Sequence, residues 1–518
     1  MPNGIWLAIP GIPLITAGLI GILQILGVTR TEEGERPVRW LGLGALASSL
    51  ILVLMAVADY LAQGVPHSLV LANWLQSGQY LSTLSFRIDG LSLTFATLIA
   101  VISLLVMRFA VNYLHREVGF ARFFMVLCLF TTAMQIIALS GSAVLSFVGW
   151  ELAGISSYLL IAYNWASNTA TDNATRAFVT NRIGDASFLL GIFMGFAWYG
   201  SSEWSVLLAP NVHIPGLLLA IMTLGFMGAA LVKSAQFPFS AWITRALEGP
   251  TPSSTIFYGS IMVHAGIYLL LRIHPLLQQV PELEYLLGLI GVLTVIYGGL
   301  GGLVQTDIKT SLVFSTLAQT GLMLLEIAFG WYALALLHLV LHAIWRAYQF
   351  LYSPSFAQFV QWQPAPAAPH WLQRYPRLYS AALHRFWLDP LADWLFIRPT
   401  QALSQEAQVF DGHILDKLSG TPSQSTGISS LADMQAIQQG RLRLENQIGV
   451  GSGLMGKSMQ ALAEYFEGIE QHLLLQQQSG KAKHTLRLIG HYLERVDRLL
   501  SQPRYLILLV AVTLVVIL

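Results

Sequence analysis

Ionisable side chains interrupt segments of this sequence that are otherwise apolar enough to cross a membrane. Lys233 lies within GFMGAALVKSAQFPFSAW, and Pro238 follows it by five residues. A cation at bilayer depth costs from ~2.5 to more than ~10 kcal/mol, and proline removes a helix hydrogen bond. A broken helix that carries a lysine is typical of transporters, in which titratable groups form ion pathways. We therefore predict that Lys233 lies on a proton or ion pathway.

Carboxylates and a further imidazole occur in neighbouring apolar segments. Glu151 is the predicted partner of Lys233, because a lysine–glutamate pair in a low dielectric has strongly coupled protonation. A static ion pair that fixes helix packing is the alternative. Asp185 and Glu326 lie nearer the ends of their segments, and each fits a pathway role or a structural role equally well. His264 lies within IFYGSIMVHAGIYLLL and joins the candidate pathway.

His338, His342 and Arg346 follow one another at a spacing of four residues, so they share one face of a helix. A file of imidazoles suits proton relay, because histidine titrates near neutral pH. Two histidines at this spacing also hold zinc in some proteins, but no third ligand stands at a fixed spacing, so no metal is predicted. Histidines that only pack in the core remain the other alternative. Arginine does not deprotonate, so Arg346 sets a field or holds an anion.

Composition places the chain among polytopic membrane proteins. Of its 518 residues 55% are hydrophobic and 11% are charged, whereas a soluble domain carries about 25% charged residues. The net charge of +1 gives no support for a nucleic-acid partner. The single cysteine, Cys128, excludes a disulfide framework and a cysteine-based metal site. We expect no cofactor in this chain, and no catalysis by this chain alone.

A helix needs roughly 20 apolar residues to cross the bilayer, and this rule yields about twelve spans. The N-terminal segment lacks a basic region and a clean cleavage site, so we interpret it as the first span and not as a signal peptide. The predicted spans are 5–27, 40–63, 91–111, 121–140, 142–163, 177–199, 216–236, 252–272, 283–304, 309–329, 331–352 and 503–518.

Basic residues are distributed unequally between the two sides of these spans, which predicts an outside N-terminus and a cytoplasmic segment 353–502. That segment begins with a Pro/Ala linker and contains amphipathic helical patterns. It would dock a partner, lie along the membrane lipid or pack on itself. One side holds Arg30, Arg36, Arg39, Arg116, Arg122, Arg176, Arg182, Arg245 and Lys309, and the other little beyond Arg87 and Arg272.

Several motifs resemble the antiporter-like subunits of respiratory complex I and of Mrp-type cation/proton antiporters. They are VGWELAGISSYLLI (148–161), RAFVTNRIGD (176–185), KSAQFPFSAWITRALEGPTPSS (233–254), VQTDIKTSLVFSTLAQTGLM (304–323) and HLVLHAIWRAYQFL (338–351). The resemblance covers roughly residues 80–352. IDGLSLTF (88–95) and DPLADWLFIRP (389–399) resemble the subunit-5 branch of that family.

The resemblance implies an all-α membrane fold with an inverted-repeat core and a hydrated proton path. In that path Glu151 matches the acidic residue of the fifth helix, and Lys233 matches the lysine of the broken seventh helix. Lys309 matches the motif lysine of the tenth helix, and His338 and His342 match the histidines of the eleventh. The helix break is expected at Pro238, Pro250 and Pro252.

The sequence also departs from the family pattern. Tyr258 stands where the family usually has histidine, and Arg346 where it has lysine. The first repeat, 121–272, is complete, whereas the second, 283–352, stops after three helices. The long horizontal helix of complex I subunits has no candidate. The remaining predicted regions are the N-terminal helices 1–120, the cytoplasmic region 353–502 and the final span 503–518.

Shortened relatives of this branch resemble the membrane subunit of DAB-type inorganic-carbon accumulation systems. In that family a large soluble zinc protein similar to a β-carbonic anhydrase docks on the membrane subunit, and ion flow is thought to drive CO2 hydration. Our leading hypothesis is a proton- or cation-conducting subunit of this kind in a prokaryotic inner membrane, with zinc in the partner. The alternatives are a proton-pumping subunit of a complex I-like or Mrp-type assembly, beside other antiporter-like subunits, and a non-conducting anchor.

Overall fold

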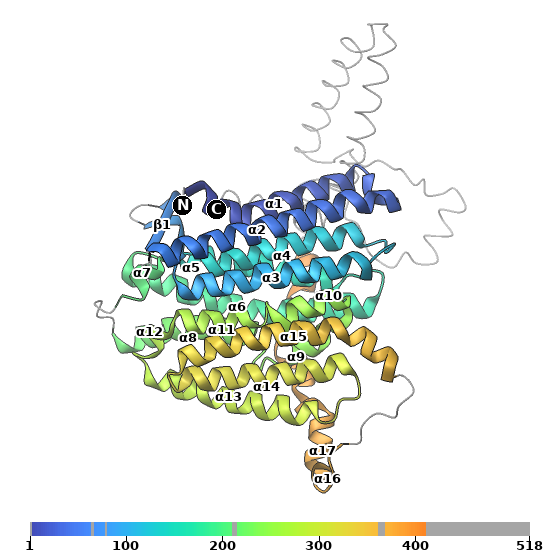
Figure 1. The fold of residues 1–518 in the computed structure, drawn as a ribbon. Coiled ribbons are helices and arrows are strands. Elements are labelled where there is room, and N and C mark those ends of the chain that lie inside the picture. The colour runs from blue at the N-terminus through green and yellow to red at the C-terminus, as the bar shows by residue number, and fades with distance from the viewer. Residues whose placement is uncertain (1–2, 64–66, 78–79, 210–214, 361–367, 411–518) are drawn as a thin grey trace, which may run out of the picture. The chain divides into compact units, whose positions relative to one another are not determined.

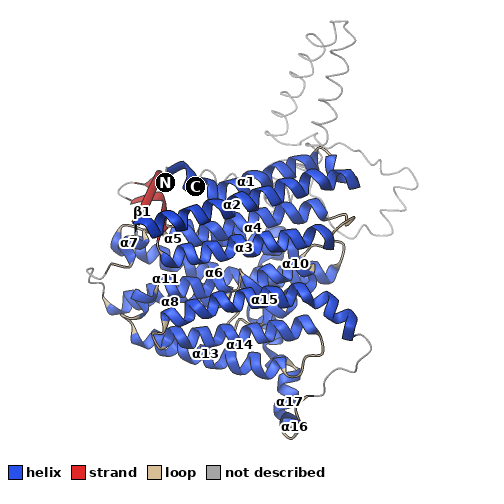
Figure 2. Cartoon of the chain, in the orientation of Figure 1, coloured by secondary structure: helices blue, strands red, loops and turns tan. Residues whose placement is uncertain are grey.

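The computed structural model describes residues 3–63, 67–77, 80–209, 215–360 and 368–410. Within them, ten helical segments are long and apolar enough to cross a membrane, and they pack side by side as a bundle (Figure 1; Figure 2). They are α1 (Asn3–Ile25), α2 (Glu35–Gln63), α3 (Gly90–Tyr113), α4 (Phe120–Leu139), α5 (Ala143–Ile161), α8 (Gly216–Lys233), the segment Thr251–Arg272, α13 (Pro281–Gly302), α14 (Ile308–Ala328) and α15 (Tyr332–Val360).

The predicted all-helical membrane fold is confirmed, with differences at the helix boundaries. An eleventh long helix, α6 (Asn168–Tyr199), is less apolar than the ten and begins well before the predicted span 177–199. Asp185 therefore lies midway along its helix and not near an end. The helix α15 continues past residue 352 to Val360. The predicted span 503–518 lies outside the described residues.

A β-hairpin that the sequence analysis did not predict closes one end of the bundle. Strands β1 (His67–Ser77) and β2 (Tyr80–Ile88) pair antiparallel, and α7 (Trp204–Leu207) lies at the same end. The Gly141 N–H donates to the Ser85 carbonyl at 2.7 Å, which ties β2 to the turn between α4 and α5. We call this end, at the left in Figure 1, the hairpin face. The strands were missed because they fill a connection that was treated as a loop between two spans.

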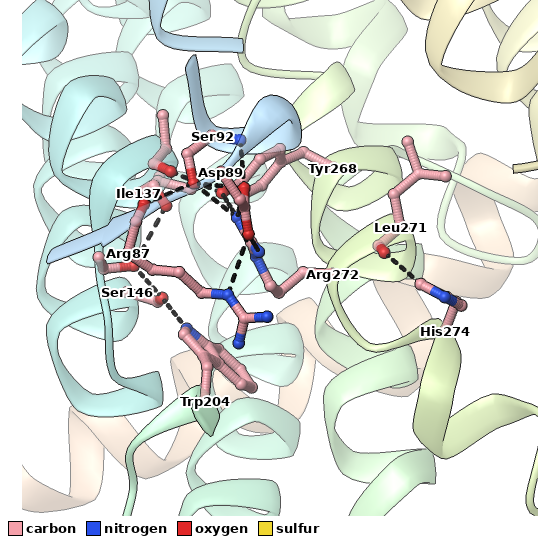
Figure 3. Close-up of polar contacts among 12 residues, drawn as sticks. Arg87, Asp89, Ser92, Ile137, Ser146, Trp204, Tyr268, Leu271, Arg272 and His274 are labelled. Carbon is pink, nitrogen blue, oxygen red and sulfur yellow. Dashed lines mark hydrogen bonds and ion pairs between the residues drawn. The ribbon is translucent and has the colours of Figure 1, made fainter. Parts of the chain in front are cut away.

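A buried ion pair fastens α3 to α11 (His264–Arg272) at the hairpin face (Figure 3). Asp89 caps α3 by accepting the Ser92 N–H at 2.9 Å, and it binds the Arg272 guanidinium through both carboxylate oxygens. The Arg272 side chain is only 4% exposed, and it also donates to the Tyr268 hydroxyl at 2.9 Å. Arg87 contacts the same carboxylate at 2.9 Å from a more exposed position. Two of the few basic residues predicted for this side thus share one carboxylate.

This ion pair makes stability depend on pH. Burial alone would raise the pKa of Asp89, but the Arg272 guanidinium and the hydrogen bonds from Arg272 and Ser92 hold that pKa well below its usual range. Because the pKa of Asp89 is lower in the folded state, its ionised carboxylate stabilises the fold at pH values above the unfolded-state pKa of about 3.9. This stabilisation is lost as the pH falls below that value towards the folded-state pKa. We expect Asp89→Asn to lower the unfolding temperature in detergent near neutral pH, by a margin that narrows below about pH 4. A margin that stays constant down to acid pH would contradict this assignment.

The chain after α15 forms short helices, α16 (His370–Gln373), α17 (Pro376–Leu383) and α18 (Leu388–Ala392). Asp389 pairs with Arg245 at 2.9 Å, and Asp393 pairs with Arg176 at 2.6 Å. These pairs attach the segment to α6 and to α9 (Ala241–Arg245). Among the described residues, α19 (Arg398–Phe410) belongs to a second unit that begins at Leu395. The amphipathic helices predicted between 455 and 502 lie outside the described residues.

Candidate functional site

The helix α8 ends at Lys233, inside the bundle. Ser234 caps the helix, and Ala235 leaves the helical conformation with φ of +52° before the short helix α9 begins at Ala241. The predicted helix break is therefore present, but it starts five residues before Pro238 and not at that proline. Lys233 is 1% exposed, so its ammonium group is held among protein atoms at the end of a helix.

Protein groups satisfy the backbone that the break exposes. The Leu231 carbonyl accepts the Gln236 N–H at 2.8 Å, and the Val232 carbonyl accepts the indole N–H of Trp242 at 3.1 Å. The side-chain amide of Gln236 donates to the Ser234 carbonyl at 2.7 Å. Irregular backbone is tolerated at membrane depth only where such partners or water replace the lost hydrogen bonds. The helix break is therefore a stable part of the folded bundle.

Pro250 and Pro252 do not break a helix. Pro250 is the N-cap of α10 (Thr251–Ser254), and Pro252 lies in its first turn, where a missing N–H costs nothing. The chain continues through a π-helical turn, η4 (Thr255–Ser260), and then into α11. The whole segment Thr251–Arg272 is buried. The local irregularity of this span is thus the π-helical turn, which is typical of functional sites.

Lys233 does not form the predicted ion pair with Glu151. Its Nζ donates to the Trp150 carbonyl at 3.1 Å and lies 5.1 Å from the centre of the Trp150 ring. Glu151 pairs instead with Arg182 at 2.6 Å, and Arg182 also lies 3.0 Å from Asp185. Both carboxylates still act electrostatically on Lys233. We call Glu151, Arg182, Asp185 and Lys233 the lysine group.

Arg182 is the member that the sequence analysis missed as a site residue. It was counted among the basic residues of a loop end, because the span was predicted to begin at 177. The helix α6 begins at Asn168, so Arg182 lies near the middle of a long helix with Asp185 one turn away, although its side chain is 39% exposed. The spacing of three residues between Arg182 and Asp185 was the available signal for an ion pair on one helix face.

Two imidazoles meet between α11 and α15. His264 Nε2 and His342 Nδ1 are 3.0 Å apart, and both side chains are buried. Arg346 places its Nε–H 3.4 Å from His342 Nε2. A guanidinium can only donate, so Nε2 of neutral His342 must be the acceptor and Nδ1 must carry the proton. His342 therefore donates to His264, and Arg346 fixes the direction of that hydrogen bond.

His338 lies between two side chains of α14. Its Nδ1 is 2.8 Å from Glu326 Oε1 and its Nε2 is 3.0 Å from Gln319 Oε1. Glu326 thus has an imidazole partner. The rings of His338 and His342 are 6.1 Å apart, on the shared helix face that their spacing predicts. We call Glu326, His338, His342, His264 and Arg346 the histidine group.

The helix α14 contacts the histidine group and the helix break that follows Lys233. Gln236, which closes the break after Lys233, donates to the Thr320 hydroxyl at 3.0 Å, and the neighbouring residue Gln319 contacts His338. Gln236 Oε1 and the Tyr258 hydroxyl are buried nearby without a described protein partner. Buried polar atoms of this kind usually bind ordered water. Polar side chains of α14 therefore lie between His338 and the helix break after Lys233, and the arrangement suits a hydrated core.

Lys309 lies apart from both groups. It is the second residue of α14, two positions after the N-cap Asp307, and its side chain is half-buried. Ten residues separate it from Gln319, which is about 15 Å along a helix. No described hydrogen bond or ion pair joins Lys309 to either group, so its role stays a prediction. Among the described residues, no three His, Cys, Asp or Glu side chains are grouped to hold a metal ion.

Comparison with known protein families agrees with this geometry. The family described as NADH:quinone oxidoreductase/Mrp antiporter, transmembrane, matches residues 140–363, and the N-terminal family of complex I chain 5 matches residues 74–124. The chain belongs to the antiporter-like membrane subunits of complex I and Mrp assemblies. The resemblance inferred from its motifs is confirmed.

Individual relatives of this antiporter-like subunit carry complex I names. It is 35% identical to NAD(P)H-quinone oxidoreductase subunit 5 of Paulinella chromatophora, over 68% of this chain and 53% of that protein. It is 34% identical to NADH-quinone oxidoreductase subunit L of Pseudomonas aeruginosa, over 65% of this chain and 55% of that protein. The chain thus spans about half the length of these curated relatives.

A solved structure shares the fold. A chain of the Mrp complex from Dietzia sp. DQ12-45-1b aligns with a TM-score of 0.60 at 20% identity, over 99% of this chain and 62% of that chain. At that identity the likeness concerns the helical architecture alone. The antiporter-like subunit is therefore a multi-pass membrane protein that shares this helical architecture.

Proposed function

We propose that this antiporter-like subunit conducts protons, or another small cation, across the membrane and couples the flow to a cytoplasmic partner. The supporting observation is that α14 contacts His338 of the histidine group and also Gln236, which lies three residues after Lys233 in the helix break. Titratable side chains at membrane depth ordinarily mark ion pathways.

The lysine group changes its formal charge when one proton moves. With all four side chains ionised, Lys233 and Arg182 balance Glu151 and Asp185, so the formal sum is zero. Loss of the Lys233 proton leaves the group with one net negative charge, which is costly in a low dielectric. The group therefore favours recapture of a proton, and the charge of its neighbours sets when Lys233 releases one.

The histidine group forms a file of proton carriers. An imidazole takes a proton on one ring nitrogen and releases it from the other, so His338, His342 and His264 can relay protons. Glu326 lies near the end of α14 at the hairpin face, and His264 lies deeper in the bundle. Arg346 holds the proton of neutral His342 on the nitrogen that faces His264. It acts on the relay without carrying a proton.

The segment after α15 supports coupling to a partner. Asp389 and Asp393 attach this segment to α9, which follows the break at Lys233, and to α6, which carries Arg182 and Asp185. A displacement of this segment is therefore transmitted directly to the helices of the lysine group. In the proposed topology the N-terminus is outside a prokaryotic inner membrane, and residues 353–502 are cytoplasmic.

We further propose that the partner is a large soluble zinc protein similar to a β-carbonic anhydrase, and that ion flow energises inorganic-carbon accumulation. This part rests on residues 353–502, which stand where the family continues its second repeat. A complex I-like or Mrp-type assembly with other antiporter-like subunits is the second candidate, and the names of the relatives favour it.

Two experiments separate these candidates. A tagged chain, purified from its native membrane, should carry with it a soluble protein that contains zinc. Together the two proteins should restore growth in air to a host that lacks carbonic anhydrase, and neither alone should do so. Recovery of other antiporter-like membrane subunits, without a zinc protein and without growth rescue, would favour the complex I-like or Mrp-type assembly.

A further inference from the structure

A small cavity lies between the buried ion pair at the hairpin face and the lysine group. Its volume is about 10 Å³, enough for about one water molecule. Ser146, Trp150, Trp204 and Arg272 contribute to its lining, and the other lining residues are largely apolar. Figure 3 shows Ser146 bound to Trp204 beside Arg272.

The polar atoms around this cavity can hold a water molecule. The Arg272 Nε–H is buried and has no partner among the described residues, whereas the two terminal nitrogens of the guanidinium bind Asp89, Ser92 and Tyr268. It is therefore a free donor on a side chain that lines the cavity. A water oxygen there satisfies it, as buried polar groups require.

Ser146 provides a matching acceptor. Its hydroxyl accepts the indole N–H of Trp204 at 3.2 Å and is paired with the hydroxyl of Ser140, which itself donates to the Ile137 carbonyl. Ser146 must then donate to Ser140, and one of its two lone pairs remains free. A water that accepts from Arg272 and donates to Ser146 has the two partners that an ordered water needs.

Trp150 connects this site to Lys233. Trp150 lines the cavity. Its carbonyl accepts a hydrogen bond from the Lys233 ammonium, and the same ammonium lies over the Trp150 ring. Trp150 lies seven residues after the start of α5 at the hairpin face, or about 10 Å along the helix. Along the helix axis, the cavity thus lies between the hairpin face and the lysine group. The segment after α15 is at the opposite end of the bundle.

We propose that this cavity is a one-water site on a second route, which links Lys233 to the hairpin face and is closed by the Asp89–Arg272 ion pair. The inference rests on the proposed function, and it concerns how protons reach the lysine group. The Asp89–Arg272 pair forms the part of the route nearest to the hairpin face, because Arg87 binds the same carboxylate and its side chain is 30% exposed. Opening the pair admits water to the site beside Trp150. Lys233 then exchanges protons with the hairpin face without passing through the histidine group.

Silver ions test this route, because Ag⁺ is close to water in size and reacts with thiols. In a Cys128→Ala background, Ser146→Cys places a thiol in the cavity, and Ser103→Cys places one at a buried serine of α3 that does not line it. The full chain is reconstituted in vesicles, and Ag⁺ is added on the hairpin side. Thiols that remain are labelled with maleimide after denaturation.

We expect Ser146→Cys to react at least about tenfold faster than Ser103→Cys, and Asp89→Asn to accelerate the Ser146→Cys reaction by a further factor of about ten. Equal rates at the two cysteines, or no acceleration by Asp89→Asn, would overturn the proposal. If Asp89→Asn does not fold, Asp89→Glu, which keeps the charge on a longer side chain, provides the same comparison. Ag⁺ access does not require conduction, so a reactive Ser146→Cys with no proton flux would overturn the proposed function and leave this water site standing.

Discussion

Lys233→Ala is expected to reduce proton flux through the reconstituted chain by about a hundredfold or more, the range of effects for a positioned proton-transfer group. In the proposed function the Lys233 ammonium carries the proton at the end of α8, where the Trp150 carbonyl accepts its hydrogen bond and the Trp150 ring lies 5.1 Å from it. Alanine leaves the Glu151–Arg182–Asp185 ion pairs in place, so the helices remain held together. Flux is measured with a pH-sensitive dye inside proteoliposomes under an imposed membrane potential.

Lys233→Arg separates proton transfer from charge. Arginine keeps a cation at this position but does not release a proton, so flux should fall as far as in Lys233→Ala. Arg116→Ala, at a side chain that is 71% exposed, is the matched control and should conduct normally. If Lys233→Ala folds, retains its partner and still conducts, the conducting role of the lysine group is wrong and the anchor hypothesis gains support.

Arg272→Met is expected to cause the largest loss of stability, about 3–5 kcal/mol, because it leaves a largely buried carboxylate with only a partly exposed partner. Asp89 accepts hydrogen bonds from Arg272 through both oxygens, and Arg272 is nearly inaccessible to solvent. The loss should be visible as a large fall in the apparent unfolding temperature of the purified chain in detergent, near neutral pH.

Arg87→Met provides the control on the same carboxylate. Arg87 is 30% exposed, and an ion pair of that kind contributes at most about 1 kcal/mol. The double variant Asp89→Asn/Arg272→Met should lose less than the sum of its single variants, since neither charge is then left unpaired. Additive losses, or an equal effect of Arg87→Met, would show that the Asp89–Arg272 pair does not fasten α3 to α11.

The membrane helices were predictable because their signal is local. Runs of apolar residues of bilayer length mark α1 to α5, α8 and α13 to α15 in the sequence itself. The spacing of His338 and His342 likewise placed both rings on one face of α15. The hairpin of β1 and β2 has no such signal, because short alternating segments resemble any polar connection between spans.

The pairing of charges was not predictable, because it depends on how helices lie against one another. Glu151 binds Arg182 and not Lys233, although both cations are on neighbouring helices. The meeting of His264 with His342 joins residues 78 positions apart, which no spacing rule encodes. The helix α8 ends at Lys233, before the predicted end at residue 236. The left-handed backbone of Ala235 could not be predicted, because alanine is not a residue type that favours that conformation.

Gln319 and Thr320 are consecutive residues of α14, one touching His338 and the other touching Gln236 beside the Lys233 break. Consecutive residues point about 100° apart around a helix axis. A single twist of this one rod therefore displaces both contacts at the same moment. The chain therefore holds a mechanical linkage between His338 and the helix break that follows Lys233, and a displacement of α14 would reach both together.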